Sequence, residues 1–131
     1  LKKGLINALK EFTQQIDKSV IAISLVAEGL ETELDSITET ILYRVVQECV
    51  NNTIKHAAAS NLDISVHNSS SGIDVLIEDN GKGFDPNITR PTDGIGLQNI
   101  SSRIQYLKGT VEWDAAPGRG TLVAIHIPFT V

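Results

Sequence analysis

The sequence predicts an α+β fold, a two-layer α/β sandwich in which a mixed, mostly antiparallel sheet is covered on one face by about three helices. Three observations favour it. Three segments carry apolar residues at helical spacing, and five or six short segments have the β-branched or alternating pattern of strands. Several consecutive strand segments are separated by turns short enough for antiparallel pairing. A chain of 131 residues with 41% hydrophobic composition is large enough to bury one hydrophobic core. We therefore expect a single domain over residues 1–131.

The first 34 residues predict a lead-in helix and strand. Apolar residues recur at helical spacing between residues 3 and 17, which indicates an amphipathic helix. The β-branched run SVIAISLV, residues 19–26, then predicts a strand. The chain also lacks Met and begins at Leu1, so we expect it to be a segment of a longer polypeptide.

The clearest predicted element is a helix that starts at Ser36. Ser36 and Glu39 have the S-x-x-E spacing of a capping box. An apolar stripe follows at helical spacing, formed by Ile41, Leu42, Val45, Val46, Cys49, Val50 and Ile54. Because Cys49 is the single cysteine and lies on this stripe, we expect a buried thiol and no intrachain disulfide.

The rest of the chain predicts two hairpins and a helix. Residues 61–68 and 73–79 alternate around SSSG, which indicates a β-hairpin that ends at the acidic pair Glu78 and Asp79. Helical spacing returns between Leu97 and Leu107, and TVEWD and TLVAIHI predict two final strands joined by APGRG. The stretch from Phe84 to Asp93 has two prolines and no apolar period, so it is the predicted mobile flap beside a pocket.

The charge balance excludes some classes of partner. A net charge of −5 gives no basic field for binding nucleic acid or an anionic membrane surface. No apolar run reaches the roughly 20 residues of a spanning helix, and the N-terminus lacks the apolar segment of a signal peptide. We expect a cytoplasmic domain without nucleic-acid or membrane contact, and whether its parent protein is anchored stays open.

Three polar residues lie along one side of the predicted central helix. At about 3.6 residues per turn, Glu48, Asn52 and Lys55 nearly superpose at the border of the apolar face. They offer a carboxylate, an amide oxygen of the kind Mg²⁺ accepts, and an ammonium group for phosphate. The same spacing is also common on a solvated helix face.

Two glycine clusters follow the predicted hairpin. Asp79 precedes Gly81 and Gly83, which places a carboxylate beside backbone that can approach a planar ligand and accept a hydrogen from a base amino group. A tight turn after a strand is the alternative explanation. Gly94 and Gly96 precede the start of a predicted helix, where free N–H groups attract anions. The alternative is that the two glycines only form a flexible entry into the helix. The Rossmann and P-loop fingerprints are absent.

In this order and spacing, the motifs resemble the ATP-binding catalytic domain of a sensor histidine kinase. This family belongs to the GHKL superfamily of Bergerat-fold ATPases, with the gyrase and mismatch-repair ATPases. The likeness covers roughly residues 38–128: ECVNNTIKHA is similar to the N box, DNGKGF to the G1 box, GIGL to the G2 box and GRGT to the last glycine box. Residues 3–34 resemble, more loosely, the lead-in of kinases with a short dimerisation domain.

The resemblance assigns the cofactors ATP and Mg²⁺ to two ends of one site. It implies that Asn52 ligates Mg²⁺, that Lys55 and His56 contact phosphates or ribose, and that Asp79 holds the adenine amino group. The remaining implied contacts come from the glycine boxes and from one threonine that would fix the adenine edge: Gly81, Gly83, Gly94, Gly96, Leu97 and Thr121.

Glu48 is the implied catalytic residue, and two roles stay open for it. In the gyrase-like branch a glutamate at this place activates water, whereas in such kinases the acid orients the incoming phosphoacceptor histidine.

Two departures from the family pattern concern the flap. Ten residues separate Gly83 from Gly94, fewer than in many kinases, and no F box is evident.

The implied function is phosphoryl transfer from ATP to a histidine of an adjacent dimerisation domain, and from there to a response regulator, within a homodimeric parent protein. The three histidines of this chain, His56, His67 and His126, lack the charged helical context of an acceptor. We therefore expect the acceptor upstream of Leu1 and no autophosphorylation by the isolated chain. The alternatives are a gyrase-like ATP hydrolase or clamp and a non-catalytic nucleotide-binding module.

Overall fold

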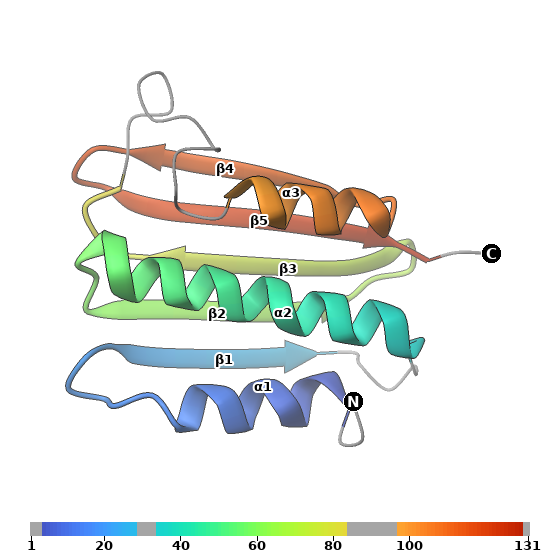
Figure 1. Cartoon of the computed structure of the whole chain (residues 1–131), viewed down its shortest axis with the longest axis horizontal. Coiled ribbons are helices and arrows are strands. Elements are labelled where there is room, and N and C mark those ends of the chain that lie inside the picture. Colours follow the sequence, from blue (N-terminus) through green and yellow to red (C-terminus); the bar gives the residue numbers. More distant parts are fainter. Residues whose placement is uncertain (1–3, 29–33, 84–96, 130–131) are drawn as a thin grey trace.

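The computed structural model describes residues 4–28, 34–83 and 97–129. Its helices and strands alternate irregularly along the chain (Figure 1). In chain order they are α1 (Leu5–Gln14), β1 (Ala22–Glu28), α2 (Ser36–Asn52), the π-helical turn η1 (Thr53–Ala57), β2 (Asn61–Asn68), β3 (Gly72–Asp79), α3 (Leu97–Tyr106), β4 (Thr110–Ala116) and β5 (Gly120–Pro128). Among these described residues, no helix is both long and apolar enough to cross a membrane.

The five described strands form one sheet in the order β1-β2-β3-β5-β4. The pair β1–β2 is parallel, and the other three pairs are antiparallel. Both predicted hairpins, β2–β3 and β4–β5, are present. The predicted mixed, mostly antiparallel sheet is thus confirmed.

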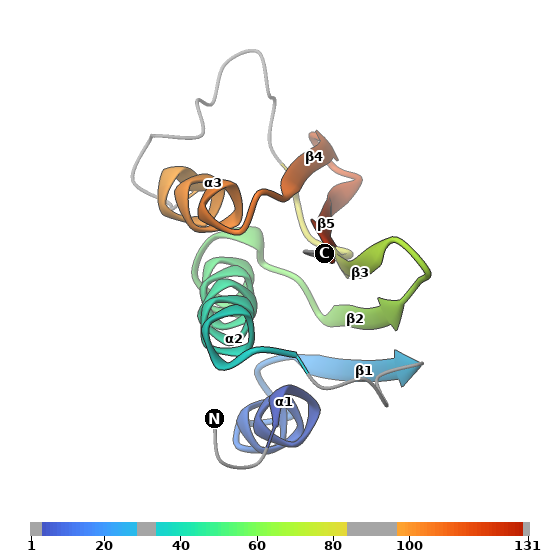
Figure 2. The ribbon, with the colours of Figure 1, turned by 90° about the vertical axis from the view of Figure 1, so that its right-hand side faces the viewer.

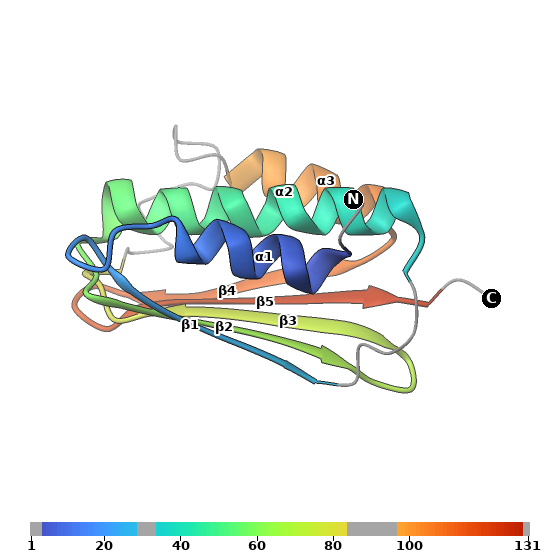
Figure 3. The ribbon, with the colours of Figure 1, turned by 90° about the horizontal axis from the view of Figure 1, so that it is seen from below.

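Helices α1, α2 and α3 all lie on one face of the sheet, and no described element covers the other face (Figures 2 and 3). The inward row of β3 shows how the alternating pattern produces this layer. Ile73, Val75 and Ile77 are buried, whereas Leu76 and Glu78, on the opposite face of the strand, are exposed. The predicted two-layer α+β sandwich is confirmed.

Helix α2 runs along the middle of the helical layer and contributes most to the core (Figure 2). The buried members of its apolar stripe are Leu42, Val45, Val46, Cys49 and Val50. Burial of Cys49, together with the nearby negative charge of Glu48, raises the pKa of the thiol to about 12. Cys49 therefore stays protonated at neutral pH and packs as a small apolar side chain, as predicted.

The predicted capping box at Ser36 and Glu39 is wrong. Asp35 is the N-cap of α2: its Oδ1 accepts the backbone N–H of Thr38 at 2.8 Å, and its Oδ2 accepts the Thr38 hydroxyl at 2.9 Å. An aspartate one residue earlier combines the capping acceptor with a charge that suits the helix dipole. Glu39 instead accepts the N–H of Leu5 at 2.9 Å, which satisfies a free donor at the start of α1.

The predicted first strand begins too early. Asp17 forms a turn in which its Oδ1 accepts both the N–H and the hydroxyl of Ser19, at 2.9 and 2.8 Å. The backbone N–H of Val20 donates to the Asp17 carbonyl as well, at 2.9 Å. This local bonding competes with strand pairing, so β1 starts only at Ala22.

The central helix also ends earlier than predicted. The α-helix stops at Asn52, and residues Thr53–Ala57 form a π turn before Ala58, which has left-handed backbone angles of φ 52° and ψ 37°. A π turn holds more residues than an α turn, so it rotates the side chains after Asn52 away from their α-helical positions. The assumption that one continuous α-helix carries Glu48, Asn52 and Lys55 is therefore wrong for Lys55.

Candidate functional site

Asp79 is the last residue of β3 and falls on the row that faces the helices. It is 8% exposed, a rare burial for a carboxylate. Its Oδ1 accepts the backbone N–H of Gly81 at 2.8 Å, which fixes the carboxylate within the turn that follows the strand. The Asp79 carboxylate therefore lies in a fixed orientation at one end of the sheet, on the face that the helices cover.

Thr121 lies directly across from Asp79 in the pairing of β5 with β3. Residues opposite each other in an antiparallel pair place their side chains on the same face of the sheet. Thr121 is half-buried, and its other cross-strand partner is Ala115 on β4. The structure thus brings together the two residues predicted to read the adenine ring.

Gly81 and Gly83 lie where the turn after β3 passes between two other backbone segments. A Cβ on Gly81 would overlap the carbonyl oxygen of Ala57, and a Cβ on Gly83 would overlap that of Ala116. The backbone of Lys82 donates to Ala57 at 2.7 Å and accepts the N–H of Gly118 at 2.6 Å. The glycines are needed for contact with the protein's own backbone, and their predicted contact with a base stays a prediction.

The other side of the site comes from the end of α2. Glu48 and Asn52 are both half-buried there, and the buried Nδ2 of Asn52 has no hydrogen-bond partner among the described residues. A buried amide without a partner costs about 1–3 kcal/mol, so a ligand that satisfied it would bind favourably. Such an amide suits a triphosphate oxygen through Nδ2 and Mg²⁺ through Oδ1.

The donor set around Asn52 fits a magnesium ion that arrives with phosphates. No group of three or more His, Cys, Asp or Glu side chains within residues 4–28, 34–83 and 97–129 could hold a metal. Mg²⁺ commonly keeps several waters and uses one or two protein ligands together with substrate phosphates. The amide oxygen of Asn52 is a donor of the kind that such a site uses.

The other predicted residues are exposed or are not fully described by the structure. Lys55 and His56 are exposed on the π turn. Leu97 is the first residue of α3, and its side chain is outside the described part. Gly94 and Gly96, like the predicted flap from Phe84 to Asp93, fall outside the described residues. The roles of these residues stay predictions.

Asn80, the neighbour of Asp79, makes contacts that the sequence did not reveal. Its side chain makes hydrogen bonds to Ser60, which precedes β2, and to Asn61, the first residue of β2. The only signal was the D-N-G tripeptide, which indicates a local turn. Partners 19 and 20 residues away could not be inferred from it.

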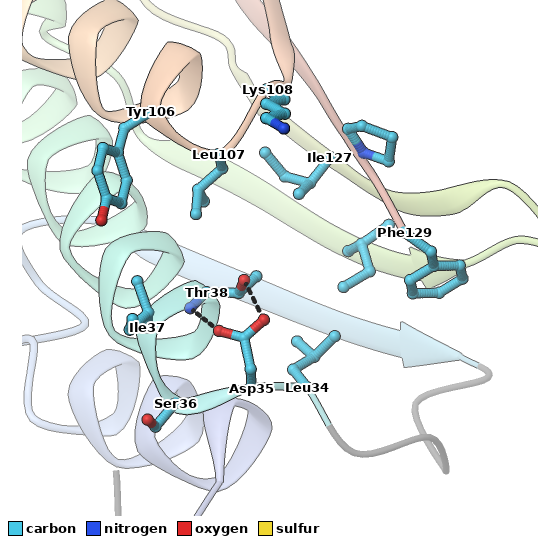
Figure 4. A pocket seen from close by; sticks show the side chains of 12 residues that line it. Leu34, Asp35, Ser36, Ile37, Thr38, Tyr106, Leu107, Lys108, Ile127 and Phe129 are labelled. Carbon is cyan, nitrogen blue, oxygen red and sulfur yellow. Dashed lines mark hydrogen bonds between the residues drawn. The ribbon is translucent and has the colours of Figure 1, made fainter. Parts of the chain in front are cut away.

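A separate cavity of about 680 Å³ opens at the opposite end of the sheet (Figure 4). It lies between the start of α2, the end of α3 and the end of β5, and Asp35 with its bonds to Thr38 forms part of its wall. Ile73, also in the wall, is six residues before Asp79, which at about 3.3 Å per strand residue is roughly 20 Å away. Among the residues that the structure describes, none of the predicted site residues lines this cavity.

Comparison with known proteins gives relatives over nearly the whole chain. The oxygen sensor histidine kinase NreB of Staphylococcus carnosus (strain TM300) is 30% identical over 128 residues, which are 97% of this chain and 37% of NreB. The signal transduction histidine-protein kinase/phosphatase DegS of Brevibacillus brevis is 34% identical over 129 residues, 97% of this chain and 33% of DegS. The chain thus spans about a third of the length of these curated relatives.

Solved structures share the fold. The blue-light activated histidine kinase EL346 of Erythrobacter litoralis superposes with a TM-score of 0.81 at 23% identity, over 95% of this chain and 42% of that one. The ATP-binding domain of PrrB from Mycobacterium tuberculosis gives a TM-score of 0.72 at 20% identity, over 97% of this chain and 92% of that one. The arrangement of three helices on a mixed sheet is thus also found in these proteins.

The family assignment comes from the greater part of the sequence. Residues 37–131 match the family model described as histidine kinase-, DNA gyrase B-, and HSP90-like ATPase. They contain all of α2 except its first residue, the turn after β3 and both hairpins. The match includes Asn52, Asp79 and Thr121, which the structure places at one end of the domain. The chain belongs to the histidine kinase-, DNA gyrase B-, and HSP90-like ATPase family.

Proposed function

We propose that the chain is the ATP-binding catalytic domain of a two-component sensor histidine kinase. It transfers the γ-phosphoryl group of ATP to a histidine on a dimerisation domain outside this chain, and that domain passes the group to a response regulator. The proposal rests on two polar groups at one end of the domain: the buried Asp79 carboxylate, which Gly81 orients, and the Asn52 amide, whose Nδ2 has no described partner. It rests also on the alignment of 97% of the chain with two named histidine kinases.

The two ends of the site divide the work of binding ATP. Asp79 accepts a hydrogen from the adenine amino group, and Thr121 borders the base. Asn52 binds Mg²⁺, which when bound neutralises charge on the phosphate oxygens, and Lys55 and His56 contact phosphates or ribose. Phosphoryl transfer depends mainly on in-line placement and charge stabilisation, so a site that only orients its substrates is sufficient. In this proposal Gly94, Gly96 and Leu97, the second glycine box, also contribute to nucleotide binding.

The proposed setting follows from the chemistry. ATP and a response regulator are both cytoplasmic, so this domain works in the cytoplasm. The phosphoacceptor lies on a dimerisation domain, so the parent protein acts as a homodimer. The named relatives are longer than this chain, which covers about a third of each of them.

The chemical step is tested by joining this chain to its natural upstream segment and following labelled phosphate from ATP. The expected result is an acid-labile, base-stable label on a histidine. Glu48→Gln is expected to slow labelling by about 10²-fold or more, because a positioned acid or base typically contributes this much, while ATP affinity changes little. Exposed Glu112, on the uncovered face of β4, supplies the control Glu112→Gln, which should label at the normal rate.

The same experiment separates the kinase from a hydrolase. A complete lack of protein label would contradict the kinase proposal. Steady phosphate release by the isolated chain, abolished in Glu48→Gln, would instead support a gyrase-like hydrolase in which Glu48 activates water.

Asn52→Ala is expected to remove most of the Mg²⁺ dependence of ATP binding. In the unmodified chain, Mg²⁺ should tighten ATP binding, and loss of one ligand should reduce this gain by about tenfold, or about 1.4 kcal/mol. Titrations of a fluorescent ATP analogue with and without Mg²⁺ measure the gain. Asn51→Ala is the matched control, since Asn51 is the exposed neighbour of Asn52. An unchanged Mg²⁺ gain in Asn52→Ala would exclude this ligand role.

A further inference from the structure

The side chain of Asn80 ties the end of β3 to the chain that leads into β2. Its Oδ1 accepts the backbone N–H of Ser60 at 3.0 Å and that of Asn61 at 2.9 Å. Its Nδ2 donates to the Ser60 hydroxyl at 2.9 Å. The backbone N–H of Asn80 also donates to the Asn61 carbonyl, at 3.3 Å. One side chain therefore satisfies three polar groups of a segment 19–20 residues earlier in the chain.

A second anchor lies two residues further on. Lys82 donates its backbone N–H to the carbonyl of Ala57, at the end of the π turn that continues α2. Gly81 stands between the two anchors and packs directly against Ala57. The position of Gly81 is thus set from both sides by the segment of residues 57–61.

Gly81 in turn holds the acid of the site. Its N–H donates to Oδ1 of Asp79 at 2.8 Å. A displacement of Asn80 would move this N–H, because the two residues are adjacent, and the Asp79 carboxylate would lose the donor that orients it. Asn80 therefore acts on the site through its neighbours.

We propose that Asn80 is a positioning residue that sets the selectivity of the site for a 6-aminopurine. It fixes the Gly81 N–H beside the Asp79 carboxylate and holds the end of β3 against the segment that leads into β2. The inference rests on the proposed function, in which Asp79 accepts the adenine amino group. Its consequence is that the Asn80 side chain controls base selectivity without contacting the base.

The test compares the Kd of ATP with that of ITP, in which a carbonyl oxygen replaces the amino group at position 6 of the purine. The unmodified chain should prefer ATP. Asn80→Ala should weaken ATP binding by about tenfold and ITP binding by less than about twofold, because only the amino group depends on the oriented carboxylate. A merely structural role would weaken both nucleotides equally.

Further variants keep the test decisive. Asn80→Asp retains a carboxylate oxygen for the two backbone donors, and the Ser60 hydroxyl can rotate to donate to it, so most of the ATP preference should return. Asn80→Gln displaces the same amide by one methylene and should lose selectivity as Asn80→Ala does, which provides a second measurement if the alanine variant does not fold. Ser60→Ala removes only one of the three bonds and should change selectivity least.

The outcomes separate this inference from the proposed function. An unmodified chain that binds neither nucleotide would overturn the proposed function. An unmodified chain that prefers ATP, with the same preference in folded Asn80→Ala and Asn80→Gln variants, would overturn only the role of Asn80. Thermal unfolding of each variant, followed by circular dichroism, shows which variants are folded.

Discussion

Asp79→Asn is expected to weaken ATP binding by about 10- to 100-fold while inorganic triphosphate binds almost as before. A hydrogen bond to a charged group is worth about 1.5–3 kcal/mol, and each 1.4 kcal/mol is about tenfold in affinity. Asparagine can still accept the Gly81 N–H through its own oxygen, so the turn is kept. Its NH₂ group would then meet the adenine amino group, and two donors would face each other.

The measurement is a titration of each ligand into the chain. Asp74→Asn is the matched control, because Asp74 lies on the opposite face of β3 and its Oδ1 contacts His126 Nδ1 at 2.7 Å. That variant should bind both ligands normally. An equal loss of ATP and triphosphate affinity in Asp79→Asn would show that the site has no distinct base end at this residue.

Gly120→Ala is expected to lower the free energy of unfolding by about 3–5 kcal/mol, the largest stability effect that we predict. Gly120 has φ +85°, which an alanine adopts only at a cost, and a Cβ there would overlap the carbonyl oxygen of Asp79. The backbone of β3 and β5 would have to separate beside the site. ATP binding should weaken as well, since Thr121 follows directly.

Gly118 supplies a control for the backbone contribution alone. It has φ +80°, close to that of Gly120, but nothing lies within 4 Å of a Cβ placed there. Gly118→Ala should therefore cost only about 1–2 kcal/mol. Each kcal/mol of lost stability lowers the Tm by roughly 3 °C. The Tm should therefore fall by about 10 °C or more for Gly120→Ala and by about 3–6 °C for Gly118→Ala. Equal shifts of the Tm in the two variants would mean that the backbone relieves the overlap between the Cβ added in Gly120→Ala and the Asp79 carbonyl oxygen without a cost in stability.

The sequence predicted the layers of the fold because apolar periodicity reports directly on which side of an element is buried. The stripe around Val45 and Val46 and the alternation of residues 73–79 both led to the observed core. The motif order also predicted that Asp79 and Thr121 belong to one site, and the register of β3 with β5 places them opposite each other.

The features that the sequence could not predict depend on hydrogen bonds between distant segments or on small changes of helix geometry. Asp35 and Ser36 are both good caps, and only the position of Thr38 distinguishes them. The π turn leaves no mark in the apolar pattern, because Thr53 is buried and Ile54 half-buried, as an α-helix would also require. The bonds of Asn80 join segments whose proximity follows only from the completed sheet.

Strand β1 extends the sheet of this domain beyond the segment that the family model matches. The family match begins at residue 37, yet β1 pairs in parallel with β2 along all seven of its residues. Leu5 and Leu9 of α1 are 5% and 0% exposed in the core. A protein trimmed to residues 37–131 would present β2 as an unpaired sheet edge, which favours aggregation. The residues that pack together here therefore extend about thirty residues beyond the segment that the family model matches.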